Sequence, residues 1–108
     1  MNSCTFSNNI ANDNVNDECN GGAIYNSGKL TVNRSAFNNN TSINDDGAIF
    51  NNQQGRLIVN NSSFTGDSSS KDGYGGAIGN DGSSTINDST FTLNSAAPGG
   101  AIWAIWAI

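Results

Sequence analysis

The sequence contains no histidine, two cysteines, one proline and only four lysines and arginines among its 108 residues. Without histidine, and with cysteines that follow no ligand spacing, the usual ligand sets for a transition metal are missing. The net charge of −5 leaves no basic stripe that could neutralise nucleic-acid phosphates. We therefore expect no metal or other cofactor and no nucleic-acid partner.

Long hydrophobic runs are also missing. The longest apolar stretch, AIWAIWAI at 101–108, falls far short of the roughly 18–20 residues of a membrane-spanning helix. The opening residues MNSCTFSNN carry neither the positive segment nor the apolar segment of a signal peptide. No leader and no membrane anchor are recognisable in these residues.

Hydrophobic residues make up 35% of the chain, whereas ordinary globular domains hold roughly 45–50% apolar residues when glycine is counted. Asparagine is abundant, with 20 copies, and there are 13 glycines. Such a polar composition is typical of disorder. The scarcity of proline and the regular recurrence of the apolar residues argue for a folded chain instead.

One tetrapeptide occurs four times. It reads GGAI at 21–24, DGAI at 46–49, GGAI at 75–78 and GGAI at 99–102, at intervals of 25, 29 and 24 residues. Such intervals indicate a repeat architecture with stacked units. We expect the last three positions to form columns along the stack, made of Gly22, Gly47, Gly76 and Gly100, of Ala23, Ala48, Ala77 and Ala101, and of Ile24, Ile49, Ile78 and Ile102.

A second signature lies between the copies of the first. Segments 30–40, 57–67 and 84–94 read LTVNRSAFNNN, LIVNNSSFTGD and STINDSTFTLN, and NSCTFSNN at 2–9 repeats the end of the pattern. The aligned residues are Asn2, Asn33, Asn60 and Asn87, then Phe6, Phe37, Phe64 and Phe91, then Asn9, Asn40, Asp67 and Asn94. We expect an inward phenylalanine column and asparagine columns at the corners, where side-chain amides hydrogen-bond along the stack.

Apolar residues alternate with polar ones inside each unit, as Leu30 and Val32 or Leu57 and Val59 show. A period of two predicts β-strands. Glycine and asparagine separate these strands, because both tolerate the left-handed backbone of sharp corners. We predict three short strands per unit, with the patterns Ala-Ile-x, Leu-x-Val and Ser-x-Phe.

Three short strands cannot bury a face alone, but stacking pairs each strand with its counterpart in the next unit. The sequence therefore predicts an all-β fold, a right-handed parallel β-helix of about four coils that is incomplete at both ends. A sandwich or propeller is the alternative for short strands at regular spacing. Identical columns favour the β-helix, because the two halves of an antiparallel hairpin need not carry the same residues.

The repeat defines one domain of stacked units. We place them at about 1–20 (partial), 21–45, 46–74, 75–98 and 99–108 (partial). We expect a fragment of a longer repeat protein, or a short open reading frame derived from one. Open ends predict marginal stability and association with further repeats or with other copies of the chain.

The alternating tetrapeptides resemble the repeats of the polymorphic outer membrane protein family and, more broadly, adhesin-like right-handed β-helix surface proteins. The four GGAI copies match the first family motif, with Asp46 replacing a glycine in the second copy. The Phe-x-x-Asn motif is matched at 6–9, 37–40 and 91–94, whereas FTGD at 64–67 departs at its last residue. The resemblance extends from residue 2 to residue 102.

This resemblance implies an exported autotransporter passenger at the bacterial outer membrane, cell surface or extracellular space, with a host-cell or glycan surface as its partner. We expect a noncatalytic structural or adhesive repeat segment and no enzyme. The alternative is a fragment of a β-helical carbohydrate-active enzyme, either a polysaccharide lyase or a glycoside hydrolase.

Polysaccharide cleavage would require carboxylates on one face. Glu18 and Asp72 share an offset from the first motif two coils apart, roughly 10 Å at about 4.8 Å per strand. Asp45 and Asp46 precede Gly47 and, with Asn44, could also offer oxygen ligands to Ca²⁺. No aromatic platform or arginine accompanies the pair and no calcium repeat is present, so we expect solvated loop acids.

Three further patterns have plain structural interpretations. Cys4 aligns with Ser35, Ser62 and Ser89, which predicts a small buried residue, and a disulfide with Cys19 is the alternative in an oxidising compartment. The outward columns Lys29, Arg56, Ser83 and Thr31, Ile58, Thr85 are too mixed to indicate an ice-binding array. We expect Trp103 and Trp106 to continue an edge strand rather than to bind carbohydrate.

Overall fold

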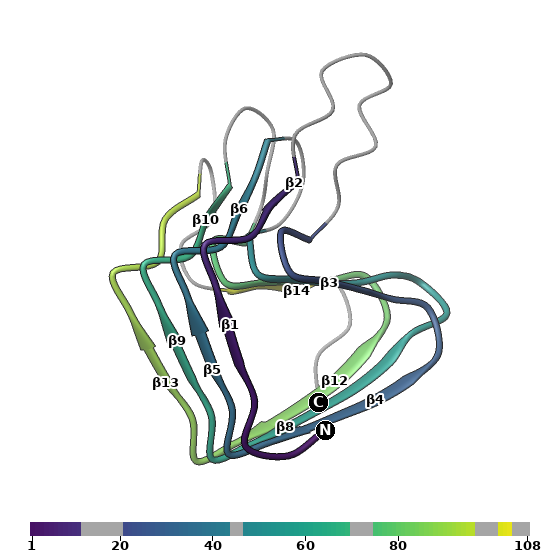
Figure 1. Cartoon of the computed structure of the whole chain (residues 1–108). Helices are drawn as coiled ribbons and strands as arrows, with labels where there is room; N and C mark the ends of the chain where they lie inside the picture. The colour runs from purple at the N-terminus through teal and green to yellow at the C-terminus, as the bar shows by residue number, and fades with distance from the viewer. Residues whose placement is uncertain (12–20, 44–46, 70–74, 97–101, 105–108) are drawn as a thin grey trace.

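The computed structural model describes residues 1–11, 21–43, 47–69, 75–96 and 102–104. All the regular elements of these residues are β-strands, and the strands form four sheets (Figure 1). All strand pairs are parallel and in register. None of the described residues forms a helix long and apolar enough to span a membrane.

The first sheet contains the phenylalanine column. Its strands, in spatial order, are β1 (Thr5–Ser7), β5 (Ala36–Asn38), β9 (Ser63–Thr65) and β13 (Thr90–Thr92). The register places Phe6 beside Phe37, Phe37 beside Phe64 and Phe64 beside Phe91. The rings stack at centroid distances of 4.9, 4.6 and 4.9 Å and are tilted by only 3–5°. Ring spacing therefore matches the separation of about 4.7–4.9 Å between neighbouring strands.

The second and third sheets contain the predicted Leu-x-Val and Ala-Ile-x segments. The strands of the second sheet are β4 (Lys29–Asn33), β8 (Arg56–Asn60) and β12 (Ser83–Asn87). The strands of the third are β3 (Ile24–Asn26), β7 (Ile49–Asn51), β11 (Ile78–Asn80) and β14 (Ile102–Ala104).

A fourth sheet corrects the prediction of three strands per unit. It consists of two-residue strands, β2 (Ile10–Ala11), β6 (Thr41–Ser42) and β10 (Ser68–Ser69). The strand predicted as Ser-x-Phe begins one residue later than expected. β5 starts at Ala36, and Ser35 lies in the corner before it. Strands of two residues are too short to show an apolar alternation, so the sequence pattern did not indicate them.

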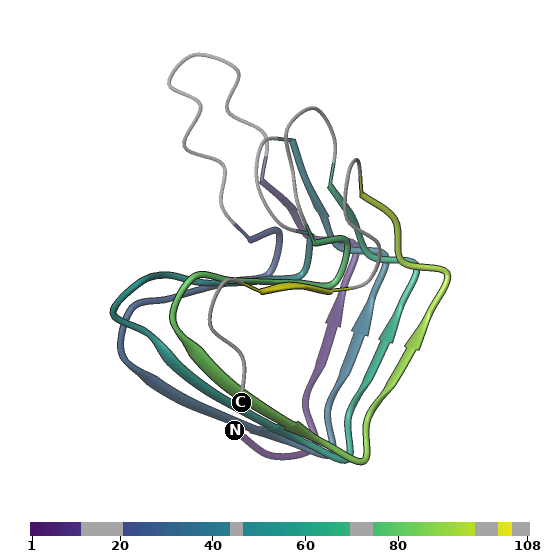
Figure 2. The same ribbon diagram turned by 180° about the vertical axis from the view of Figure 1, so that it is seen from behind.

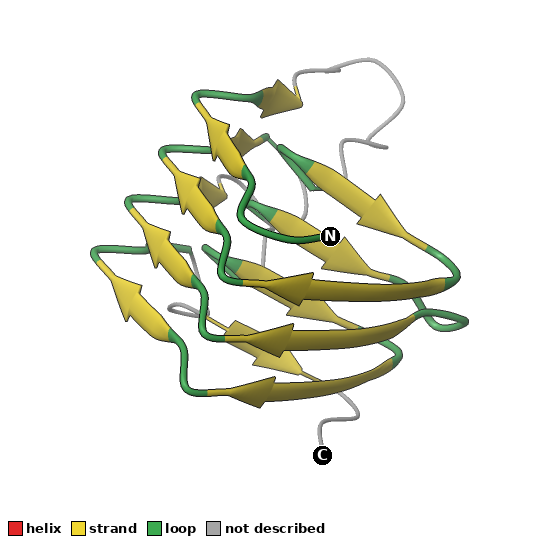
Figure 3. Ribbon diagram, turned by 60° about the horizontal axis from the view of Figure 1, so that its bottom comes forward, coloured by secondary structure: helices red, strands yellow, loops and turns green. Residues whose placement is uncertain are grey.

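The chain winds into a right-handed coil. In Figure 1 the first coil is nearest the viewer, and the chain runs up β1, across β3 and back down β4 in a clockwise turn. Later coils lie behind it, and the view from behind in Figure 2 shows the same order reversed. Figure 3 shows the coils stacked along one axis with corresponding strands above one another. The prediction of a parallel β-helix is confirmed.

The core occupies the space between the first three sheets. Its fully buried apolar side chains are Val32, Phe37, Ala48, Ile49, Leu57, Val59, Phe64, Ala77 and Ile78. Each large side chain among them contributes roughly 1.5–3 kcal/mol of hydrophobic stabilisation. Because these residues stack on residues of similar shape, the core is a set of parallel apolar columns.

The central glycine of the GGAI tetrapeptide is required by close backbone approach. The Gly22 amide donates to the Gly47 carbonyl, and the Gly47 amide donates to the Gly75 carbonyl at 2.8 Å. A Cβ atom on Gly47 would overlap the Gly76 carbonyl, and one on Gly76 would lie 2.5 Å from the Ser95 amide nitrogen. No side chain fits between coils at this point. Gly100 and Ala101 of the same motif lie outside the described residues.

A buried ladder of three asparagines follows the isoleucine column. Asn26 Nδ2 donates to Asn51 Oδ1 at 2.7 Å, and Asn51 Nδ2 donates to Asn80 Oδ1 at 2.6 Å. All three side chains are buried. Asparagine near glycine was interpreted from the sequence only as a break between strands, so this internal hydrogen-bonded column was not predicted.

The same three amides close the corner that follows each strand. Each Nδ2 donates to the carbonyl of a corner glycine in its own coil, at 3.0 Å for Gly28, 3.2 Å for Gly55 and 3.2 Å for Gly82. The amide therefore fixes the corner regardless of how many residues separate it from the glycine.

A second ladder marks the next corner. Asn33 Nδ2 donates to Asn2 Oδ1, Asn60 to Asn33 and Asn87 to Asn60, at 2.9, 2.9 and 2.8 Å. These side chains are exposed or half-buried, in contrast to the first ladder. The structure thus places the hydrogen-bonded asparagines expected from the second signature at a corner of each coil.

Left-handed backbone recurs at two corners of each coil. One column of positive φ contains Ser3, Arg34, Asn61 and Asp88, and the other contains Asn8, Asn39, Gly66 and Leu93. Asparagine and glycine adopt this conformation readily, whereas arginine and leucine do so at a cost.

A candidate binding surface at the corner between β7 and β8

One corner of the stack is longer than its counterparts. Two residues separate β3 from β4 and two separate β11 from β12, whereas Asn52–Gly55 separate β7 from β8. The additional residues, Gln53 and Gln54, are exposed, and their loop projects from the stack (Figure 3). The loop is ordered by two hydrogen bonds at 2.9 Å, from the Gly55 amide to the Asn52 carbonyl and from the Gln54 amide to Asn52 Oδ1.

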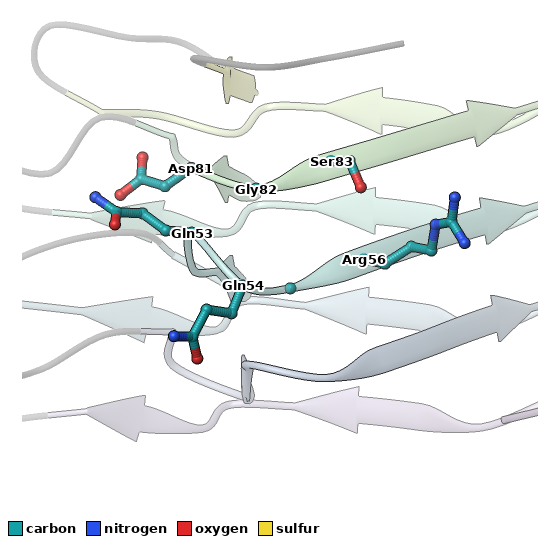
Figure 4. A pocket seen from close by; sticks show the side chains of 7 residues that line it. Gln53, Gln54, Arg56, Asp81, Gly82 and Ser83 are labelled. Carbon is teal, nitrogen blue, oxygen red and sulfur yellow. The ribbon is translucent and has the colours of Figure 1, made fainter.

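The projecting loop borders an open pocket of about 570 Å³ (Figure 4). We call its lining residues the corner surface, which consists of Gln53, Gln54, Gly55, Arg56, Asp81, Gly82 and Ser83. In Figure 4 Gln53 and Asp81 lie on one side of the pocket, while Arg56 extends along β8 on the other. Burial raises the pKa of the Asp81 carboxyl. The donors and acceptors gathered here suit a hydroxyl-rich polar ligand.

An aromatic pair lies on the outer face of the third sheet beside this loop. The rings of Tyr25 and Phe50 are 5.5 Å apart at an angle of 42°, and Tyr25 is 52% exposed. Asn52 Nδ2 donates to the Tyr25 hydroxyl at 3.0 Å, which links the pair to the projecting loop. The pair occupies the variable position of the Ala-Ile-x segments, where the other coils have Gly79 and Trp103. That variable position is the sequence signal that could have revealed it.

The predicted loop sites fall on other parts of the chain. The acids that we expected to be solvated loop residues, Glu18, Asp45, Asp46 and Asp72, lie outside the described residues, and so does Asn44. Cys19 and Trp106 lie outside them too, so the structure does not test the disulfide. Within the described part of the chain, no three histidine, cysteine, aspartate or glutamate side chains are grouped as a metal site would require.

The structure places Cys4 in the serine column. Its amide donates to Ser35 Oγ at 3.2 Å, just as the Ser35 and Ser62 amides donate to Ser62 Oγ and Ser89 Oγ at 3.1 Å. Cys4 is half-buried rather than buried, and its Sγ donates to the Asn2 carbonyl at 3.3 Å.

The outward residues of the second sheet form the columns predicted from the aligned repeat units. Lys29, Arg56 and Ser83 share one register position, and Thr31, Ile58 and Thr85 share another. Arg56 and Ser83 also line the corner surface, so this sheet contributes polar groups at its edge.

The alternation of the two tetrapeptides, now seen as stacked columns, can be compared with known repeats. Residues 3–27 match the Chlamydia polymorphic membrane protein repeat. The match spans one copy of each motif, Phe6–Asn9 and Gly21–Ile24, and confirms the resemblance inferred from the sequence. No curated protein and no solved structure matches the chain. Later coils repeat the two tetrapeptides in register, with Asp46 and Asp67 as departures.

Proposed function

We propose that this chain is a noncatalytic repeat segment of a bacterial surface protein, with a structural and adhesive role. One observation carries the proposal. Both family motifs form the interior and corners of the coil, where Ile49, Ile78, Phe37 and Phe64 are fully buried. The motifs thus build the scaffold, and the outward residues remain free to differ between coils.

The corner surface and the adjoining Tyr25–Phe50 pair are the contact region that we propose for adhesion. Aromatic faces beside amide and carboxylate groups suit a glycan, because sugars present both apolar C–H faces and hydroxyl groups. Gln53 and Gln54 supply the amides, and Tyr25 supplies the exposed ring. A glycan on a host-cell surface is therefore the proposed partner.

Binding of the purified chain to a glycan array and to cultured epithelial cells tests the adhesive role. Removing Gln53 and Gln54 in a Tyr25→Ala background should reduce binding at least tenfold, whereas Thr31→Ala on the second sheet should not change it. Far-UV circular dichroism verifies that each variant keeps its fold. Absence of binding to every glycan and cell type would contradict the adhesive role.

The enzymatic alternative predicts a different result. Incubation with acidic and neutral polysaccharides should release no products if the segment is noncatalytic. Turnover that disappears in Asp45→Asn or Asp72→Asn would establish the carbohydrate-active enzyme instead.

Surface location is a separate part of the proposal and rests on the family match at 3–27. Antibody labelling and protease treatment of intact cells of the source bacterium test it. Labelling of intact cells is the expected result, and labelling only after lysis would contradict it.

A further inference from the structure

The last residue of the Phe-x-x-Asn motif forms a third side-chain ladder, in which one member is an acid. Asn9, Asn40, Asp67 and Asn94 stack in consecutive coils. Asn40 and Asp67 are both fully buried. A carboxylate therefore stands where the neighbouring coils have a neutral amide.

Both oxygen and nitrogen of the asparagine amide are used in this ladder. The Asn40 amide group donates from Nδ2 to Asp67 Oδ1 at 2.9 Å and to the Phe6 carbonyl of the preceding coil at 3.1 Å. Asn94 Nδ2 donates in the same way to the Phe64 carbonyl at 3.0 Å. An asparagine at this position thus needs its NH₂ group to join adjacent coils.

Only one oxygen of Asp67 is satisfied. Oδ1 accepts from the Asn40 backbone amide at 2.8 Å and from Asn40 Nδ2. Oδ2 is buried and has no hydrogen-bond partner. At the same position of the neighbouring coils, Asn40 Nδ2 and Asn94 Nδ2 donate to the Phe6 and Phe64 carbonyls, and Asn40 Nδ2 also donates to the Oδ1 of the next coil. From this correspondence we infer that Oδ2 takes the place of the amide nitrogen and is directed at two acceptors, the Phe37 carbonyl and Asn94 Oδ1. Two acceptors in contact repel each other unless a proton lies between them.

We propose that protonation of Asp67 completes this ladder, so that the third coil is more stable in mildly acidic than in neutral solution. A carboxylic acid donates one hydrogen bond, which Oδ2 can direct to the Phe37 carbonyl or to Asn94 Oδ1. The ionised form leaves both acceptors facing a buried negative charge. Mildly acidic solution therefore stabilises this part of the stack, independently of what the corner surface binds.

The surroundings of the carboxyl support this direction. Burial raises the pKa of Asp67 to about 6, and the hydrogen bonds from the Asn40 backbone and side chain only partly oppose this increase. The Asn40 amides donate to the carboxyl from one neighbouring coil, and Asn94 Oδ1 accepts from the Asp67 backbone amide from the other. In the part of the chain that the structure describes, no charged side chain hydrogen-bonds to Asp67.

The sign of the pH dependence follows from the raised pKa. The folded chain holds the Asp67 proton up to about pH 6, whereas the unfolded chain releases it near the ordinary aspartate pKa of 3.8. Between these values the folded state binds more protons, so stability falls as pH rises. Relative to a chain whose Asp67 is protonated in both states, the folding equilibrium constant is lower by roughly a hundredfold at pH 7 and by a few-fold at pH 4.

Urea unfolding of the full chain and of Asp67→Asn between pH 4 and pH 7 tests the proposal. The variant restores the amide and should be more stable than the original chain, by roughly a hundredfold in the unfolding equilibrium constant at pH 7 and by a few-fold at pH 4. Asp88→Asn removes the same charge from an exposed corner and should show no such pH-dependent gain.

A second variant moves the acid by one coil. In the Asp67→Asn background, Asn40→Asp should make the chain again less stable at pH 7 than at pH 4. The reason is that the new carboxyl would face the Phe6 carbonyl. The proposal is overturned if Asp67→Asn is no more stable than the original chain at pH 7, if its advantage is unchanged at pH 4, or if the relocated acid shows no pH dependence.

Discussion

Replacement of Asn51 by alanine tests whether the buried asparagine ladder holds the coils together. Asn51 is fully buried, accepts from Asn26 at 2.7 Å and donates to Asn80 at 2.6 Å, to Gly55 at 3.2 Å and to Ser83 at 3.1 Å. Alanine would remove the acceptor of Asn26 Nδ2 and the donor to the Gly55 and Ser83 carbonyls and to Asn80 Oδ1, in a site closed to water. Loss of a buried hydrogen-bond partner costs about 1–3 kcal/mol, and the simultaneous loss of several predicts a destabilisation of about 2–6 kcal/mol.

The measurement is urea unfolding followed by far-UV circular dichroism, with the slope of the transition compared between variants. Asn60→Ala is the matched control, because Asn60 also joins two coils through its amide, at 2.9 Å to Asn33 and 2.8 Å from Asn87. Its side chain is half-buried, so water can replace the lost partners and the cost should be about 0.5–1.5 kcal/mol. Equal losses in the two variants would refute the argument that burial makes the Asn51 ladder the stronger one.

Three other substitutions have expected outcomes that thermal or urea unfolding can check. Phe37→Ala removes the centre of the ring stack and should cost about 3–5 kcal/mol, and a loss below 1 kcal/mol would contradict the packing. Gly76→Ala places a methyl group 2.5 Å from the Ser95 amide nitrogen and should destabilise the chain by at least about 1–3 kcal/mol, whereas Gly28→Ala, with no heavy atom within 4 Å, should cost far less. Leu93→Asn should stabilise the chain by about 1 kcal/mol, because Leu93 has φ 59° and is 83% exposed; an unchanged midpoint would show that its backbone carries no strain.

The β-helix could be predicted because stacking imposes the same residue at the same position in each unit. The stacked rings require phenylalanine and the close backbone approach requires glycine at the same position of each coil. Both requirements therefore appear in the sequence as the same residue type at aligned positions. The pairing of Phe37 with Phe64 and of Ile49 with Ile78 follows from that alignment.

Other features leave weaker traces in the sequence. The strands β2, β6 and β10 contain two residues each, too few for a period of two to be recognised. Asn26, Asn51 and Asn80 precede a corner glycine by two to four residues, in segments where asparagine is also favoured by its backbone alone. The sequence therefore did not show that their side chains point inward. The missing partner of Asp67 is a property of three coils together and becomes visible only when the neighbouring amides are placed around it.

The long corner between β7 and β8 has a consequence for how such a protein can diversify. The Asn51 amide reaches the Gly55 carbonyl across three intervening residues, while Asn26 and Asn80 reach Gly28 and Gly82 across one, and the following strands keep their register. Because the Asn51 amide holds the two ends of the corner together, the number of residues between them can change without shifting the register of the following strand. Peptides grafted at Gln53 and Gln54 would therefore alter the outward face of this corner and leave the underlying coils in place.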